Sequence, residues 1–203
     1  HAVLAEDAEA VGFVEEQREA SALFPCAGGF DSRIECQQIG LICNFTKYGD
    51  EGKVMGLAPL GEDTYADFFE GVLSPAKKGF ELNPEYFLPF GANQGMEISD
   101  GGEMIVHRLY SDKFVRELGP PREPYAEITQ RDMDVAFGLQ RIFEKYYMHV
   151  LTDLHSLVPS NRMAMAGGCA LNSVANGKAL LETPFTEHCI QPAAGDDGLA
   201  LGA

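Results

Sequence analysis

Two adjacent glycines stand in the stretch MAMAGGCALNSVANG, residues 163–177, between an apolar run and a segment rich in asparagine. Because glycine has no Cβ, Gly167 and Gly168 allow the backbone to approach a ligand closely. A helix that begins after such a turn offers N–H groups and a partial positive charge, which suit a phosphate. The stretch is neither a Walker A sequence nor G-x-G-x-x-G. The residues alone therefore leave two interpretations open, a phosphate-binding loop and a plain turn.

A second glycine turn, AAGDDG at residues 193–198, places two neighbouring carboxylates between glycines. At the end of a strand, Asp196 and Asp197 could bind a divalent metal or accept hydrogen bonds from a ribose. An exposed acidic turn explains the same residues, so both interpretations stay open.

The third candidate is DEGKVMGLAP, residues 50–59, in which one lysine stands among acidic residues and glycines. Lys53 can pair with a phosphate as a compact point charge. The alternative for the same residue is a salt bridge at the protein surface.

The elements that must position these segments follow an order typical of an α/β domain. Apolar residues recur at helical spacing over residues 128–158, which predicts one long helix. Thr129 followed by Asp132 resembles a capping box at its start. The other expected elements are a short helix at 64–73, a strand or hairpin at 79–90, a strand at 162–166, a helix at 177–184 and a strand at 188–190.

The 203-residue chain has the composition of a folded globular protein, with 45% apolar and 23% charged residues. No run approaches the roughly 20 apolar residues of a membrane-spanning helix, and the N-terminal residues lack the layout of a signal peptide. The formal net charge is −16, and Lys and Arg do not cluster. Since such a surface repels phosphate backbones, we expect no nucleic acid among the partners. Because no run is long and apolar enough to span a bilayer, we expect no membrane among them either.

The five cysteines are irregularly spaced and include no C-x-x-C. This pattern disfavours a zinc ribbon or a disulfide framework and favours a reducing, cytoplasmic location. Cys169 and Cys189 stand among apolar or small residues, so we expect both to be buried packing residues. The histidines form no H-E-x-x-H pair, and no Ser-His-Asp set can be picked out. The catalytic residues therefore stay unknown.

Three motifs in this order resemble one family, namely EGKVMGLAPLG at 51–61, AGGCALNSVANGKALLETPF at 166–185 and QPAAGDDGLALGA at 191–203. They are similar to the hallmarks of the O-carbamoyltransferases related to nodulation protein U and to the cephem and aminoglycoside carbamoyltransferases. The long helix is similar to the one that this family places before its Gly-Gly strand. The resemblance covers about residues 34–203, whereas residues 1–33 match the family poorly.

The resemblance implies a domain like the tRNA threonylcarbamoyl transferase, with the actin, sugar kinase and Hsp70-type (ASKHA) fold, in which two α/β lobes close over a nucleotide. Residues 1–203 are expected to form part of this domain, mainly one lobe and part of the other. A synthase-like C-terminal domain, which makes carbamoyl-adenylate from carbamoyl phosphate and ATP, is expected beyond Ala203. The large domain then transfers the carbamoyl group to a hydroxyl of a small natural product such as an antibiotic.

Two other functions compete with this one. A tRNA threonylcarbamoyl transferase-like enzyme would share the fold, but the acidic net charge argues against tRNA as a partner. A non-catalytic Hsp70-type nucleotide-binding module would bind nucleotide without transferring a carbamoyl group.

The resemblance also assigns residues to the nucleotide and carbamoyl-adenylate site. The glycine turn would border the phosphate and sugar of the adenylate, and the segment 51–56 would come from the adjoining nucleotide side. The assigned residues are Gly167, Gly168, Asn172, Asn176, Glu51, Lys53 and Gly56.

A mononuclear iron site is part of the same family pattern, and the metal there polarises carbamoyl or phosphate oxygens as a Lewis acid. Asp197 is expected to be one ligand, with Asp196 as the alternative. The family's other ligands are two histidines in H-x-x-x-H and an aspartate in an Asp-Gly stretch, and this chain has no H-x-x-x-H. His1 could be the second histidine because alanine follows it, and Asp7 or Asp31 could stand in for the aspartate.

Overall fold

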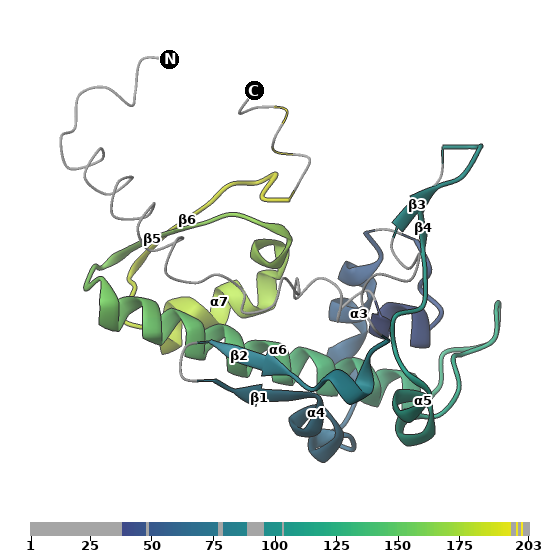
Figure 1. Ribbon diagram of the computed structural model, residues 1–203. Coiled ribbons are helices and arrows are strands. Elements are labelled where there is room, and N and C mark those ends of the chain that lie inside the picture. The colour runs from purple at the N-terminus through teal and green to yellow at the C-terminus, as the bar shows by residue number, and fades with distance from the viewer. Residues whose placement is uncertain are drawn as a thin grey trace.

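The computed structural model describes residues 38–47, 49–76, 79–88, 96–102 and 104–195, together with Gly198 and Ala200. Within these residues the strands form two-stranded sheets, antiparallel for β1–β2 and β3–β4 and parallel for β5–β6 (Figure 1). The mixture of helices and strands agrees with the expected α/β class. The elements are α3 (Glu51–Leu57), η1 (Ala58–Leu60), α4 (Ala66–Val72), β1 (Leu73–Pro75), β2 (Phe80–Leu82), η2 (Pro84–Tyr86), β3 (Met96–Ile98), β4 (Met104–Val106), α5 (Asp112–Leu118), α6 (Gln130–Leu157), β5 (Arg162–Met165), η3 (Gly168–Leu171), α7 (Ser173–Glu182) and β6 (Glu187–Ile190), where η marks a 3-10 helix.

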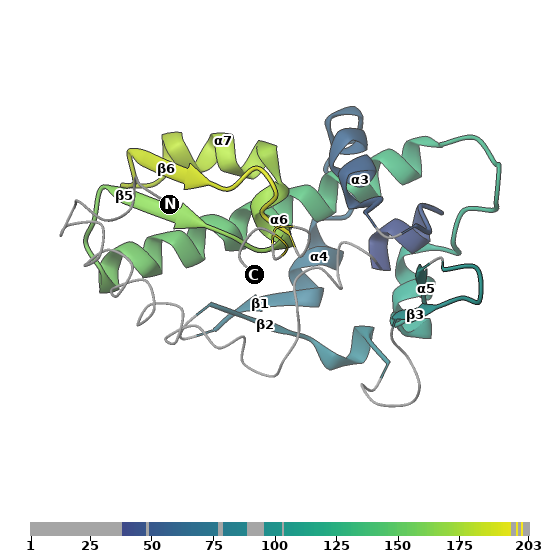
Figure 2. The ribbon, with the colours of Figure 1, turned by 90° about the horizontal axis from the view of Figure 1, so that it is seen from above.

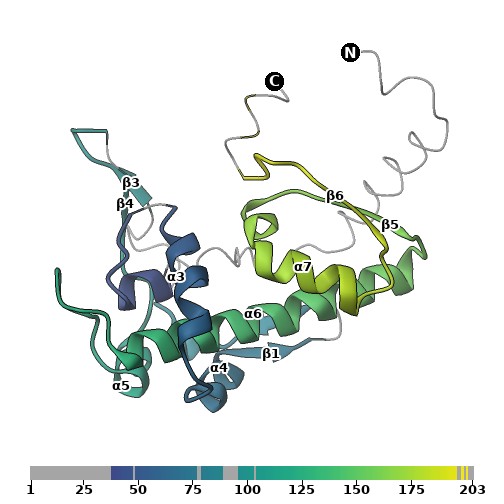
Figure 3. The same ribbon diagram turned by 180° about the vertical axis from the view of Figure 1, so that it is seen from behind.

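The long helix α6 is the element along which the others are arranged, with α7 on one side and β1–β2 on the other (Figures 2 and 3). The capping box predicted from the sequence is present at its start. The backbone N–H and the hydroxyl of Thr129 both donate to Oδ2 of Asp132, at 2.9 and 2.8 Å. The prediction of one long helix over 128–158 is therefore confirmed. In the described part of the chain, no helix is both long enough and apolar enough to cross a bilayer.

The larger hydrophobic core packs against the N-terminal half of α6 and is rich in aromatic rings. The ring of Phe68 lies edge-on to Phe69, Tyr86 and Phe114, with centroids 5.0, 5.4 and 5.0 Å away. This edge-to-face geometry is the one that aromatic quadrupoles favour, and it joins α4, η2 and α5. A Cβ at Gly138 of α6 would lie 2.4 Å from the Phe69 ring, so only glycine fits there.

The segment that follows η1 lies directly on the backbone of α6. A Cβ at Gly61 would be 2.1 Å from the carbonyl oxygen of Met133, closer than any such contact in proteins. The carboxylate of Asp134 accepts from the backbone N–H of Glu62 and from the hydroxyl of Thr64, both at 2.9 Å. The last glycine of EGKVMGLAPLG therefore has a packing role, and Asp134 fastens the segment behind it.

A smaller core lies between the C-terminal half of α6 and the unit formed by β5, α7 and β6. In the parallel pair, Met163 is opposite His188 and Ala164 is opposite Cys189. Because side chains alternate along a strand, Met163 is buried in this core whereas Cys189 is exposed. The expectation that Cys189 is a buried packing residue is therefore wrong, and Cys169 is only half-buried.

Two expected elements differ from the observed ones. Helix α7 begins at Ser173 and not at residue 177, because Asn172 caps it. The strand or hairpin expected at 79–90 is the strand β2, paired with β1, followed by the short helix η2.

Candidate functional site

The glycine turn lies at the carboxyl end of β5. Gly167 has φ of 101°, a conformation that strongly favours glycine. No described atom lies within 4 Å of the position that a Cβ would take there. Gly168 begins η3, and the first amides of a helix have no acceptor inside it. The turn therefore combines an open side with backbone donors.

The second glycine turn lies beside the first. The N–H of Gly167 donates to the carbonyl oxygen of Ala194 at 2.7 Å, and the N–H of Gly198 donates to that of Gly195 at 3.0 Å. Since β5 and β6 are parallel, both turns follow the carboxyl ends of neighbouring strands. This edge is where open α/β sheets bind ligands.

Asn172 and Asn176 follow the turn, and their side chains form hydrogen bonds with backbone groups of η3 and α7. Oδ1 of Asn172 accepts from the N–H of Ala175 at 3.0 Å and so caps α7. Nδ2 of Asn176 donates to the carbonyl oxygen of Ala170, in the middle of η3, at 2.7 Å.

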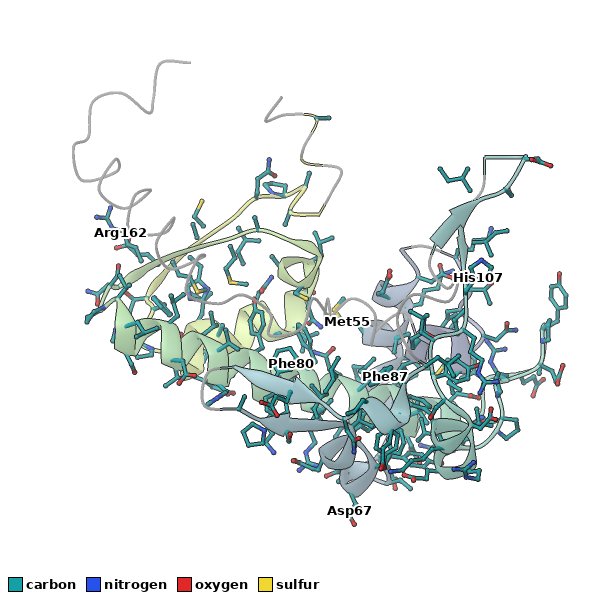
Figure 4. All side chains as sticks on the ribbon, viewed as in Figure 1. Met55, Asp67, Phe80, Phe87, His107 and Arg162 are labelled. Atoms are coloured by element: carbon teal, nitrogen blue, oxygen red, sulfur yellow. The ribbon has the colours of Figure 1, made fainter. Side chains whose placement is uncertain are left out.

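Helix α3, which carries Glu51, Lys53 and Gly56, lies next to the start of α7. The sulfur of Met55, a residue labelled in Figure 4, is 4.0 Å from the hydroxyl of Ser173. This contact places Met55 of α3 beside Ser173, the first residue of α7.

Lys53 is engaged in a salt bridge at the surface. Its ammonium lies 2.6 Å from Oδ1 of Asp50, and its side chain is 58% exposed. The ammonium also lies 5.9 Å from the centre of the Phe45 ring. The salt-bridge interpretation therefore describes Lys53 in this structure, and the exposure of the side chain leaves it free to reorient.

The proposed metal ligands His1 and Asp197, and their alternatives Asp196, Asp7 and Asp31, lie outside the described residues. Among the residues that are described, no group of three or more His, Cys, Asp or Glu side chains could hold a metal ion.

Sequence reasoning misses three residues of α6 that contact α7 near the turn. Gln140 pairs with Asn172, Tyr147 donates to Asn176, and Glu144 contacts Lys178. Their one signal in the sequence is a polar row at helical spacing, which is also typical of a solvated helix face.

Comparison with known proteins identifies the family. A family model described as Carbamoyltransferase N-terminus matches residues 34–203. The chain belongs to this carbamoyltransferase family. The predicted resemblance over residues 34–203 is thereby confirmed.

Relatives of this carbamoyltransferase domain include nodulation proteins. It is 37% identical over 155 residues to the uncharacterized protein sll1178 of Synechocystis sp., covering 75% of this chain and 23% of that protein. Over 185 residues it is 32% identical to the nodulation protein NolNO of Sinorhizobium fredii, covering 83% and 22%. Over 161 residues it is 34% identical to the nodulation protein NolO of Bradyrhizobium diazoefficiens, covering 76% and 24%. The chain thus spans about a quarter of the length of these relatives.

Proposed function

We propose that the protein transfers a carbamoyl group from carbamoyl-adenylate to a hydroxyl of a small natural product such as an antibiotic. The adenylate would be made from carbamoyl phosphate and ATP. The observation that carries this proposal is the hydrogen bond from Gly167 to Ala194, which sets two glycine turns side by side at the carboxyl edge of β5–β6. The chain belongs to a carbamoyltransferase family, and this edge would receive the adenylate's phosphate, because open α/β sheets bind ligands at the carboxyl ends of their strands.

The reaction requires little nucleophilic help from the protein. The acceptor oxygen attacks the carbamoyl carbon, the bond from that carbon to the phosphate oxygen breaks, and AMP leaves with the electron pair. The hydroxyl proton passes to a base or to water. The protein must hold the two reactants in line and stabilise the charge that develops on the leaving phosphate.

The glycine turn would contact the phosphate, and residues of α3 would line the opposite side of the site. Gly167 and Gly168 allow close approach of the backbone. Lys53 would exchange its contact with Asp50 for the phosphate, because a carboxylate and a phosphate compete for the same ammonium. Glu51 and Gly56 share its helix.

The same proposal extends to the wider architecture. The chain would form part of an ASKHA-type domain, mainly one lobe and part of the other. A synthase-like domain in the same protein would deliver carbamoyl-adenylate to it. The working location would be the cytoplasm, where ATP and reduced thiols are available.

Iron in the ferrous state is the metal we propose, with Asp197 and His1 as ligands. Both residues lie outside the described part of the chain, and the described part offers no ligand set of its own. A bound metal would supply Lewis-acid polarisation of a carbamoyl or phosphate oxygen.

Two alternatives make different predictions. Transfer of threonylcarbamoyl to tRNA needs a basic face, whereas this chain has 31 Asp and Glu against 15 Lys and Arg. A non-catalytic nucleotide-binding module would bind ATP and yield no carbamoylated product.

The deciding experiment is mass spectrometry of products formed by the full-length protein with carbamoyl phosphate, ATP and a panel of hydroxylated acceptors. We expect one acceptor to gain a single carbamoyl group. The replacement Gly168→Val adds a branched side chain where the phosphate approaches, so it should lower nucleotide affinity while the fold survives. Unaltered affinity in this variant would remove the glycine turn from the site.

A further inference from the structure

A row of polar side chains joins α6 to α7, where apolar packing is usual between helices. The α6 members are spaced i, i+4 and i+7 and therefore share one face of the helix. Each member is at least partly buried. We name this set the α6–α7 polar seam, and it consists of Gln140, Glu144, Tyr147, Asn172, Asn176 and Lys178.

Gln140 is held by hydrogen bonds that fix which way its amide faces. Its Nε2 donates to Oε1 of Glu144 at 2.8 Å and to Oδ1 of Asn172 at 3.2 Å, and its Oε1 accepts from Nδ2 of Asn172 at 2.9 Å. An ionised carboxylate can only accept, so Glu144, which Lys178 also contacts, draws Nε2 toward itself. The pairing then orients Asn172 so that its Oδ1 caps α7 at Ala175.

Tyr147 contacts both ends of the glycine turn. Its hydroxyl donates to Oδ1 of Asn176 at 2.6 Å. Nδ2 of the same Asn176 side chain donates to the carbonyl oxygen of Ala170 at 2.7 Å. The same hydroxyl oxygen lies 3.1 Å from the sulfur of Met165, the last residue of β5. Burial raises the pKa of the Tyr147 phenol, so the group stays a donor at neutral pH. The turn is thus held between the strand that enters it and the helix that leaves it.

Stability alone is a poor explanation for this arrangement. Hydrogen bonds within a protein contribute little net free energy because they replace bonds to water, and a buried polar group that loses its partner is costly. An apolar contact between α6 and α7 would hold the helices together without that risk. What the polar seam adds is direction, because hydrogen bonds fix the orientation of the groups they join.

We propose that Gln140 and Tyr147 are positioning residues, which hold the backbone of the turn from Gly167 to Leu171 in the conformation that receives the phosphate of the adenylate. Neither residue needs to touch the ligand. This inference rests on the proposed function, because it assumes that the turn binds a phosphate.

The test is hydrogen–deuterium exchange of the full-length protein, followed in peptides that cover residues 163–178 while ATP is titrated. The concentration that gives half of the protection reports nucleotide affinity at this turn alone. Tyr147→Phe removes one hydroxyl and keeps the ring. Tyr146→Phe is the matched control, because the adjacent buried hydroxyl donates to the carbonyl oxygen of Leu73 at 3.2 Å, away from the turn.

We expect Tyr147→Phe to raise the half-protection concentration about tenfold, the factor that corresponds to one hydrogen bond of ordinary strength. Tyr146→Phe should leave the half-protection concentration unchanged. This holds even if Tyr146→Phe and Tyr147→Phe lower the unfolding temperature of the wild-type protein by similar amounts. Gln140→Met, which keeps the length of the side chain and deprives Asn172 of its partner, should shift it in the same direction as Tyr147→Phe. It also serves as the second variant if Tyr147→Phe does not fold.

Equal shifts in the two tyrosine variants, or none, would overturn the positioning role while the phosphate-binding turn stood. If ATP gives no protection in the wild-type peptides and Gly168→Val changes nothing, the proposed function itself fails and this inference fails with it. The two failures are therefore distinguishable.

Discussion

The backbone N–H of Gly167 donates to the carbonyl oxygen of Ala194 at 2.7 Å. This bond joins the turns that follow two neighbouring parallel strands, so their backbones are set relative to each other before any ligand arrives. Preorganised backbone donors cost no reorganisation when charge develops near them. Because of this bond, the two turns at the carboxyl edge of β5–β6 form one candidate site.

The replacement Gly61→Ala should destabilise the protein. The added Cβ would lie 2.1 Å from the carbonyl oxygen of Met133, and both atoms belong to backbone that cannot turn aside. Overpacking of this kind costs about 1–3 kcal/mol or more. Chemical denaturation measures the loss. As a control, Gly52→Ala in α3 has no described neighbour within 4 Å and should stabilise the helix by up to about 1 kcal/mol. Equal stability of Gly61→Ala and wild type would contradict the close packing on α6.

Because of Asp134, the free energy of unfolding of the protein should fall as the pH is lowered into the acid range. Burial pushes its pKa up, but hydrogen bonds from Gln130, the N–H of Glu62 and the hydroxyl of Thr64 outweigh burial and hold the pKa below its usual value. A carboxyl group of this kind stabilises the fold above its unfolded pKa of about 3.9. That contribution is lost as the pH falls through the lower, folded-state pKa.

The variant Asp134→Asn should therefore be less stable than wild type at neutral pH and should lose less stability on acidification from about pH 4 to about pH 2. Denaturant midpoints measured across this range give the comparison. Asp63→Asn is the control, because that carboxylate pairs with Arg141 at the surface, with side chains 44% and 48% exposed, and such pairs contribute little. Parallel pH profiles for wild type and Asp134→Asn would refute the role of Asp134.

Thiol reagents should distinguish Cys43 from Cys189. Burial, together with the charge of Asp132, raises the pKa of the Cys43 thiol to about 12, so almost no thiolate forms at pH 8. Cys189 is exposed on the outer side of β6. We expect a maleimide to label Cys189 in the native protein and Cys43 only after denaturant is added, with the modified peptides identified by mass spectrometry. Labelling of both at the same rate in the native protein would show that Cys43 is accessible.

The replacement Asp197→Asn should lower bound iron and transfer activity together, because an amide is a weaker ligand than a carboxylate for a cation. Metal content by elemental analysis and product formation by mass spectrometry follow the two losses. Asp196→Asn is the matched variant at the neighbouring position and should retain both. Unchanged iron in Asp197→Asn would remove this residue from the metal site, and loss only in Asp196→Asn would exchange the two assignments.

Those parts of the fold that local patterns determine could be predicted from the sequence. Helix α6 is recognisable because its apolar spacing continues over many turns and a capping pair precedes it. The strands β5 and β6 follow from short apolar runs beside glycine turns. The pattern of residues 51–61 predicts no element, because glycines inside α3 weaken the helical signal.

Other features depend on packing that no local pattern contains. The start of α7 depends on Asn172, and its capping role is fixed by Gln140, which stands on another helix. The exposure of Cys189 depends on which face of β6 meets the helices. The candidate site is similar in this respect, since the glycines are visible in the sequence whereas the residues that hold them are not.

Tyr146 and Tyr147 are neighbours in the chain, yet their hydroxyls bind on different sides of α6, one at Leu73 and the other at Asn176. Each residue added to an α-helix turns the side chains beyond it by about 100°. A single insertion or deletion within α6 would rotate the residues on one side of the change relative to those on the other. The contacts of α6 with β1 and its contacts with α7 could then not both be kept. Among homologous chains, we expect differences in length to fall in the connections at 119–129 and 158–161, and the number of residues in α6 to stay constant.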